Sequence, residues 1–224
     1  MNVIAAMYQR WARGEAGDGD AWGDITTEPG GVDYLEVTAD GVPALWVEPH
    51  GASRDRVIVY LHGGGFIGGS LYTHRKLVGH LAKATGVRAL VVHYRLATEA
   101  PYPAQVEDAL TAYRWVVDQG LTVALAGDSS GGGLAVLAAL RIRDRELPRP
   151  AALLLISEWA DMAMTGTTFE TNAGTDVVFT REMVKGLVEL YLAGGAAADL
   201  RVGGHGDDRD DVRDQRRHRC GLHP

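Results

Sequence analysis

Short apolar segments alternate with longer amphipathic ones along most of this chain. The short segments are rich in β-branched residues and predict strands, whereas apolar side chains at helical spacing predict helices in the longer ones. The predicted strands are Tyr34–Thr38, Ala44–Glu48, Arg56–His62, Arg88–His93, Thr122–Ala126 and Ala152–Ile156. The predicted helices are Thr73–Thr85, Ala104–Gln119, Ser130–Arg143 and Arg181–Leu192.

The order of these segments predicts an α/β fold. The first two strands join through Asp40-Gly41, which is a turn signal of antiparallel hairpins. From Arg56 onward strands and helices alternate, and strands such as Arg56–His62 are apolar on both faces. Parallel strands buried between two layers of helices have this pattern. We therefore predict a mainly parallel central sheet flanked by helices.

Composition and charge narrow the choice of partners. The chain has 224 residues, of which 46% are hydrophobic, and this is enough for one sizeable core. A net charge of −7 argues against nucleic acid and favours a small neutral or apolar substrate. One cysteine, Cys220, permits no internal disulfide, and with no signal peptide pattern this is typical of a cytoplasmic protein. No segment reaches the ~20 apolar residues of a membrane span.

The motif with the clearest chemistry is Gly127-Asp128-Ser129-Ser130-Gly131. It follows a predicted strand and opens a predicted helix, and this context favours Ser129 as a nucleophile at a sharp turn. Glycines at both ends remove Cβ atoms that would clash in such a turn. Taken alone, the same residues could equally cap the helix and form an ordinary turn.

A second motif, His62-Gly63-Gly64-Gly65, ends another predicted core strand. Its presence favours the nucleophile over the helix cap as the role of Ser129. Its backbone can approach a substrate closely, so we assign the N–H groups of Gly64, Gly65 and Ser130 to an oxyanion hole. We expect His62 to orient this loop rather than act as the catalytic base, because in hydrolases of this type the base follows the nucleophile.

A competing interpretation is a dinucleotide-binding loop. Gly63, Gly65 and Gly68 satisfy the G-x-G-x-x-G pattern behind a strand. That pattern requires an acidic residue about 20 positions later for the ribose, yet no Asp or Glu occurs between Asp55 and Glu99. We therefore favour the hydrolase.

Four segments together resemble the hormone-sensitive-lipase-like branch of α/β-hydrolase esterases. In chain order they are His62–Phe66, Tyr94–Ala97 running on to Tyr102–Ala104, the motif Gly127–Gly132, and Ser157–Asp161. The resemblance implies the α/β-hydrolase fold and hydrolysis of carboxylic esters of short to medium acyl chains, without metal or cofactor. It also implies cap elements, here the helix Ile4–Arg13 and residues 158–193.

Several positions depart from the family pattern. Thr98 and Ala100 stand where Pro and His are usual, and Glu158 stands where Pro is usual. The family's triad Asp and His follow further strands, and neither is identified in this chain. We therefore expect an α/β-hydrolase domain over residues 1–195 in which the last strands are missing.

Residues 196–224 form a polar tail that we expect to be disordered or foreign to the family, for example through a frameshift. His205, His218 and His223 are the only histidines after Ser129, and we interpret them as solvated. Metal ligation by them is disfavoured because a disordered segment holds no preformed geometry.

The predicted function is that of a serine carboxylesterase or lipase-like hydrolase that forms an acyl-enzyme. Without an identified Asp and His we expect slow turnover. The alternative is a non-catalytic protein of the same fold that binds a small molecule, or an inactive remnant. We expect a small-molecule ester as the partner, and the sequence does not set the oligomeric state.

Overall fold

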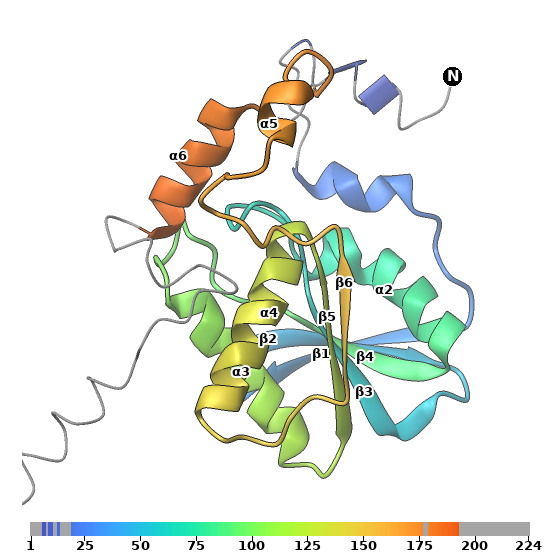
Figure 1. Cartoon of the computed structure of the whole chain (residues 1–224). Coiled ribbons are helices and arrows are strands. Elements are labelled where there is room, and N and C mark those ends of the chain that lie inside the picture. Colours follow the sequence, from blue (N-terminus) through green and yellow to red (C-terminus); the bar gives the residue numbers. More distant parts are fainter. Residues whose placement is uncertain (1–5, 8, 11–12, 14–18, 177–178, 193–224) are drawn as a thin grey trace, which may run out of the picture.

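The computed structural model describes residues 6–7, 9–10, 13, 19–176 and 179–192. Within them a six-stranded sheet of order β1-β2-β4-β3-β5-β6 forms the centre of the molecule (Figure 1). The strands are β1 (Val32–Ala39), β2 (Val42–Pro49), β3 (Ser53–Leu61), β4 (Val87–Val92), β5 (Thr122–Asp128) and β6 (Ala152–Ile156). The helices are η1 (Gly19–Ile25), α2 (Leu71–Thr85), α3 (Ala104–Val117), α4 (Ser129–Asp144), α5 (Thr168–Thr171) and α6 (Arg181–Leu192).

The sheet changes from antiparallel to parallel along its width. β2 pairs antiparallel with both β1 and β4, whereas β4, β3, β5 and β6 pair parallel to one another. This arrangement confirms the predicted α/β fold with an antiparallel opening pair. Parallel pairing also brings the carboxyl ends of β3, β4, β5 and β6 to one edge of the sheet, where the connecting loops meet.

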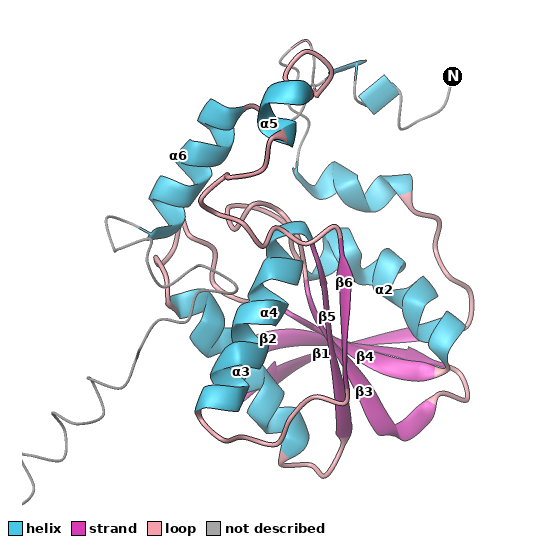
Figure 2. Cartoon of the chain, in the orientation of Figure 1, coloured by secondary structure: helices cyan, strands magenta, loops and turns pink. Residues whose placement is uncertain are grey.

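Both faces of the sheet are covered by helices (Figure 2). In β3, Val57 and Val59 belong to the core cluster that includes residues of α3 and α4, whereas Ile58 and Tyr60 belong to the cluster that includes residues of α2. Successive side chains of a strand point to opposite faces, so a strand between two helical layers must be apolar at every position. This explains the unbroken apolar run Val57–Leu61 in the second half of β3.

Some boundaries and two short elements differ from the prediction. η1 and α5 were not predicted, and α4 begins at Ser129, one residue earlier than expected. α2 begins at Leu71 because Ser70 caps it: its side chain accepts from the N–H of Thr73, and its own N–H donates to Thr73 Oγ1 at 2.8 Å. Half of the residues of the expected helix Ile4–Arg13 are described, and residues 6, 7, 9 and 10 among them are helical. The tail 196–224 lies entirely outside the described residues.

None of the helices in the described ranges has the length and hydrophobicity needed to cross a membrane. At the edge of the sheet, β6 pairs with β5 and with no other described strand. Three of its side chains, Leu153, Leu154 and Ile156, are 45%, 39% and 40% exposed. An apolar strand edge with unpaired backbone groups can pair with another chain.

We expect Leu154→Lys to reduce concentration-dependent self-association, because a charge at a strand edge opposes edge-to-edge pairing. Light scattering over a range of protein concentrations measures this effect. The control is Leu190→Lys on α6, where the leucine is 43% exposed but belongs to a helix. An equal reduction by both substitutions would contradict a role for the strand edge.

Candidate active site

The two glycine-containing motifs, far apart in the sequence, meet at the carboxyl edge of the sheet. Parallel pairing of β3 and β5 sets Leu61 opposite Gly127. β3 continues into the loop 62–69, which we call the glycine loop, and β5 continues into Ser129 at the start of α4. The structure therefore brings Ser129 and the glycine loop together, as the sequence predicts.

Ser129 occupies a strained turn between β5 and α4. Its φ is 51°, in the left-handed region that side-chain-bearing residues rarely adopt. A Cβ on Gly127 would lie 2.5 Å from the carbonyl of Gly131, and a Cβ on Gly131 would lie 2.1 Å from Leu61 O. Glycine is therefore required at both positions for the strand and helix to approach this closely.

The segment after β6 also packs against this turn. The N–H of Trp159 donates to Ser129 O at 2.8 Å. A Cβ on Gly132 would lie 2.8 Å from Glu158 Cβ, and one on Gly133 would lie 2.3 Å from Trp159 O. Glu158 and Trp159 are therefore held against the first turn of α4, next to Ser129.

The glycine loop folds back on itself through its own backbone. Gly64 has a φ of 131°, and its carbonyl accepts the N–H groups of Ile67 and Gly68 at 3.1 and 3.0 Å. A Cβ on Gly64 would lie 2.2 Å from Gly68 O. No other residue type fits this position without moving the loop.

Several N–H groups of the glycine loop donate to protein acceptors. Gly63 N–H donates to Asp128 Oδ1 at 3.0 Å, and Phe66 N–H donates to Ser130 Oγ at 3.3 Å. Among the described residues, the N–H groups of Gly64 and Gly65 have no such acceptor. These two donors lie between two anchored neighbours and are available to a bound molecule.

A partly buried carboxylate, that of Asp128, joins the turn at Ser129 to the glycine loop and α2, and sequence reasoning did not find it. Asp128 Oδ1 accepts from Tyr60 Oη at 2.9 Å and from Gly63 N–H, and lies 3.3 Å from His74 Nε2. Burial alone would raise the pKa of Asp128, but the hydrogen bond and charge of His74, with the donors Tyr60 and Gly63, hold it below its ordinary value. Asp128 lies within the Gly-Asp-Ser motif, but nothing in the sequence pairs it with His74.

His62, at the start of the glycine loop, is fully buried and acts within the loop. Its Nδ1 lies 2.9 Å from Gly63 O, and its ring stacks on Tyr94 with 4.4 Å between centroids. Tyr94 Oη donates to His62 O at 2.6 Å. Burial lowers the pKa of His62 to about 4, so the imidazole is neutral at pH 7 and Nδ1 carries the proton donated to Gly63 O.

A cavity of about 290 Å³ opens directly at Ser129. Gly65, Ser129 and Trp159 line it on the side of the sheet, and several residues of the α5–α6 region, including Phe169 and Leu187, form the opposite wall. α6 is anchored through a residue outside this wall. The ring of Tyr191 stacks on Phe66 of the glycine loop with 4.1 Å between centroids.

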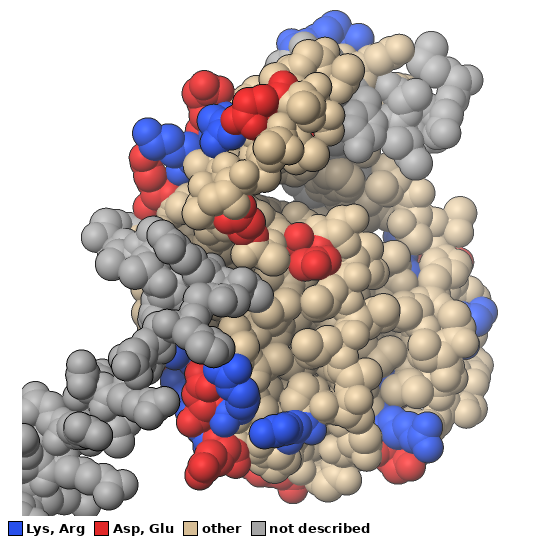
Figure 3. Space-filling model, in the orientation of Figure 1, with Lys and Arg blue, Asp and Glu red and all other residues tan. Residues whose placement is uncertain are grey.

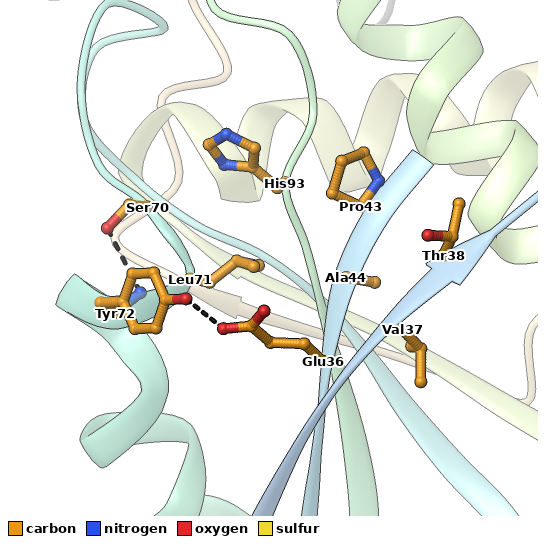
Figure 4. A pocket seen from close by; sticks show the side chains of 9 residues that line it. All are labelled: Glu36, Val37, Thr38, Pro43, Ala44, Ser70, Leu71, Tyr72 and His93. Atoms are coloured by element: carbon orange, nitrogen blue, oxygen red, sulfur yellow. Dashed lines mark hydrogen bonds between the residues drawn. The ribbon is translucent and has the colours of Figure 1, made fainter. Parts of the chain in front are cut away.

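A second pocket lies beside the start of α2 (Figure 4). It has a larger volume, about 390 Å³, and is lined by Glu36, Ser70, Tyr72 and His93 among others. The hydroxyl of Tyr72 donates to Glu36 across it. Neither Ser129 nor residues 62–69 line this pocket, so it is not the candidate reaction site despite its larger volume. The smaller cavity is the candidate, because Ser129 and Gly65 line it.

The sequence identifies no triad Asp or His, and the histidines that follow the nucleophile have no described position. His205, His218 and His223, the only histidines after Ser129, lie outside the described residues. Among the residues that are described, no group of three or more His, Cys, Asp or Glu side chains is placed to bind a metal ion. The arrangement at Ser129 thus offers a hydroxyl, unpaired backbone donors and a cavity.

The buried His62 predicts a loss of stability in mild acid. Between pH 6.5 and about 4 the unfolded chain binds a proton at this histidine and the folded chain does not, so stability falls as pH falls. With 1.36 kcal/mol per pKa unit, the free energy of unfolding should decrease by about 3 kcal/mol over this range. Urea unfolding at several pH values measures it.

His62→Asn, whose amide can still donate to Gly63 O, should flatten this pH dependence. His80→Gln is the control, because His80 is exposed and bonds only through Nε2 to Thr27 O among described residues. An unchanged slope in His62→Asn would contradict the assignment.

The known proteins that this chain resembles are hydrolases. A profile of the family described as "alpha/beta hydrolase fold" matches residues 58–208. An acetyl-hydrolase of Streptomyces hygroscopicus is 42% identical over 179 residues, which are 78% of this chain and 58% of that protein. The hormone-sensitive lipase of Mus musculus is 38% identical over 101 residues, which are 42% of this chain and 13% of that lipase.

Solved structures similar to this chain include esterases. The crystal structure of an esterase from the bacterial hormone-sensitive lipase family has a TM-score of 0.80 at 38% identity, over 86% of this chain and 68% of that one. Crystals of the protein EstE5 soaked with p-nitrophenyl butyrate give a TM-score of 0.76 at 35% identity, over 86% of this chain and 69% of that one. The chain belongs to the α/β-hydrolase-fold family, and its likeness to esterases of the hormone-sensitive lipase type confirms the resemblance drawn from its sequence.

Proposed function

We propose that this protein hydrolyses carboxylic esters through an acyl-enzyme on Ser129. The observation that supports this most is that a serine at a strained strand-to-helix turn lines the same cavity as Gly65. Among the described residues, the backbone N–H of Gly65 and that of the neighbouring Gly64 have no protein acceptor. The strain at Ser129 is maintained by close packing of Gly127 and Gly131. Strain of this kind concentrates at reactive residues.

In the proposed reaction, Ser129 Oγ attacks the ester carbonyl and the carbonyl oxygen becomes negatively charged. The N–H groups of Gly64, Gly65 and Ser130 donate to that oxygen, and one such donor typically stabilises the transition state by about 3–4 kcal/mol. The amino end of α4 adds a favourable dipole. The alcohol leaves, and water then attacks the acyl-serine and releases the acid. None of these steps requires a metal or cofactor.

A serine hydroxyl also needs a base to accept its proton, and the described residues do not supply one after Ser129. His62 is excluded from this role because its ring is fully buried, its pKa is lowered to about 4, and its Nδ1 is bonded to Gly63 O. His62 instead holds the glycine loop in place. We assign no residue to the triad Asp and His.

Small esters of short to medium acyl chains are the proposed substrates. The cavity of about 290 Å³ has the size for such a molecule and is walled by apolar and aromatic side chains, including Phe169, Phe179 and Leu187. The acetyl-hydrolase and esterase relatives support the same class. We further propose a cytoplasmic location, supported by the single cysteine, Cys220.

We expect a fluorophosphonate probe to label the full chain at Ser129, and Ser129→Ala to abolish the labelling. Such a probe reacts with an activated serine and mimics attack on a carbonyl. Ser157→Ala is a matched control, because Ser157 lines the same cavity. Mass spectrometry locates the label, and p-nitrophenyl butyrate hydrolysis follows turnover.

The outcomes separate the two functions that the sequence leaves open. Labelling that is lost in Ser129→Ala and retained in Ser157→Ala supports the hydrolase. If the folded protein is not labelled, Ser129 is not activated in this chain, and a small-molecule-binding role replaces the proposal.

A further inference from the structure

The helix α6 is amphipathic, and its apolar face packs against the glycine loop. Val184, Leu187 and Tyr191 are buried and follow one another at intervals of three and four residues, so they lie on one side of the helix. Lys185 and Glu189 pair with each other on another side and are 66% and 67% exposed. Figure 3 shows charged side chains along the outer side of the α5–α6 region. The buried face is therefore the one that acts on the rest of the molecule.

Leu187 packs directly on Gly65, one of the assigned oxyanion donors. A Cβ on Gly65 would lie 3.2 Å from Leu187 Cδ1, which is tighter than ordinary van der Waals contact. Leu187 is buried, and it lines the cavity at Ser129 together with Gly65. Because a close-packed interior transmits small movements, the position of Gly65 depends on the position of Leu187.

Tyr191, one turn further along α6, packs on the next residue of the glycine loop. Its ring stacks on Phe66 with 4.1 Å between centroids and 25° between ring planes, and both side chains are fully buried. Tyr102 holds Tyr191 from another direction. The two rings lie 5.6 Å apart, and Tyr102 N–H donates to Tyr191 O at 2.8 Å. The stack on Phe66 thus has a fixed partner.

Phe66 needs support because its backbone is strained. Its φ is 63°, in the left-handed region that a residue with a side chain rarely adopts. Its N–H donates to Ser130 Oγ at 3.3 Å, which is longer than most N–H···O bonds, and its carbonyl accepts the N–H of Ala97 at 2.7 Å. The contact with Tyr191 adds support from outside the sheet to the residue that directly follows the two free donors.

The hydroxyl of Tyr191 takes no part in this contact. It is buried and has no hydrogen-bond partner among the described residues. A buried hydroxyl without a partner costs stability, whereas the ring contributes packing. Phenylalanine at this position would keep the ring and remove the hydroxyl, so one conservative substitution separates the two.

We propose that Tyr191 and Leu187 are positioning residues of the oxyanion hole. Their packing on Phe66 and Gly65 holds the N–H groups of Gly64 and Gly65 in the orientation that a developing oxyanion needs. Such donors act only within hydrogen-bond distance of the oxyanion, so a small displacement of the loop weakens them. Tyr191 acts through the loop alone, because it does not line the cavity. The inference rests on the proposed function for the reaction, but the positioning can be tested without turnover.

Amide hydrogen exchange of the glycine loop tests the positioning directly. The N–H groups of Phe66, Ile67 and Gly68 donate to protein acceptors and are the reporters. Tyr191→Leu keeps an apolar side chain and removes the ring, and we expect it to speed their exchange by about tenfold or more. Tyr191→Phe should leave their exchange within about twofold, because the ring remains. Nuclear magnetic resonance or mass spectrometry of the full chain measures both.

The matched control is Tyr113→Leu in α3. Tyr113 is also fully buried, and its hydroxyl donates to Pro148 O at 2.6 Å, so the same substitution costs stability outside the glycine loop. Unchanged loop exchange in Tyr191→Leu would overturn the inference, as would an equal increase in Tyr113→Leu. If Tyr191→Leu does not fold, Leu187→Ala, a smaller truncation of the same face, replaces it with the same expectation.

The rate of fluorophosphonate labelling at Ser129 measures the effect on chemistry. The maximal rate per molecule reports stabilisation of the oxyanion, and the half-saturating probe concentration reports binding. We expect Tyr191→Leu to lower the maximal rate by about ten- to hundredfold and to change the half-saturating concentration less than about twofold, whereas Tyr191→Phe retains both. An unchanged maximal rate in Tyr191→Leu would overturn the inference. If the unsubstituted chain is not labelled, the proposed function fails, while exchange in the loop still decides the positioning.

Discussion

The carboxylate of Asp128 is the contact on which the geometry of the site depends most. Asp128 directly precedes Ser129, and its carboxylate accepts hydrogen bonds from Gly63 of the glycine loop and from Tyr60 of β3. His74 of α2 lies against the same oxygen. One side chain therefore ties the turn that carries the serine to the loop that carries the backbone donors, and ties both to a helix on the far face of the sheet.

Burying a carboxylate is costly unless several partners stabilise its charge. At Asp128 the partners come from three different elements, so the charge is satisfied only when β3, α2 and the glycine loop are all in place. The pKa of Asp128 is lowered because these partners stabilise its charged form. The cooperation of these elements keeps Ser129 in its strained conformation, whose cost of about 1–3 kcal/mol the surrounding packing must offset.

The sequence predicts well those features that repeat locally. The apolar run Val57–Leu61 in β3 and the helix Arg181–Leu192 can be predicted from sequence, because burial produces a regular pattern of apolar residues in each. The strand-to-helix context of Ser129 likewise needs only neighbouring residues.

Features that depend on long-range contacts are harder to predict. The approach of His74 to Asp128 follows from the packing of α2 against the sheet, chiefly against β2 and β4, which no local pattern encodes. The short helices η1 and α5 have too few turns to establish a period, and the cap of α2 uses Thr73 where the usual signal has Glu or Gln.

The nucleophile and the wall of the cavity rest on different supports. Ser129 and the glycine loop are fixed by contacts among β3, β5 and α4 that allow no Cβ at Gly127 or Gly131. The opposite wall comes from the α5–α6 region, which meets the glycine loop through the stacking of Tyr191 on Phe66. Side chains on that wall can therefore change without disturbing the serine. Glu158 differs because its Cα and Cβ pack against Gly132 in the first turn of α4, so its backbone is part of the support of Ser129.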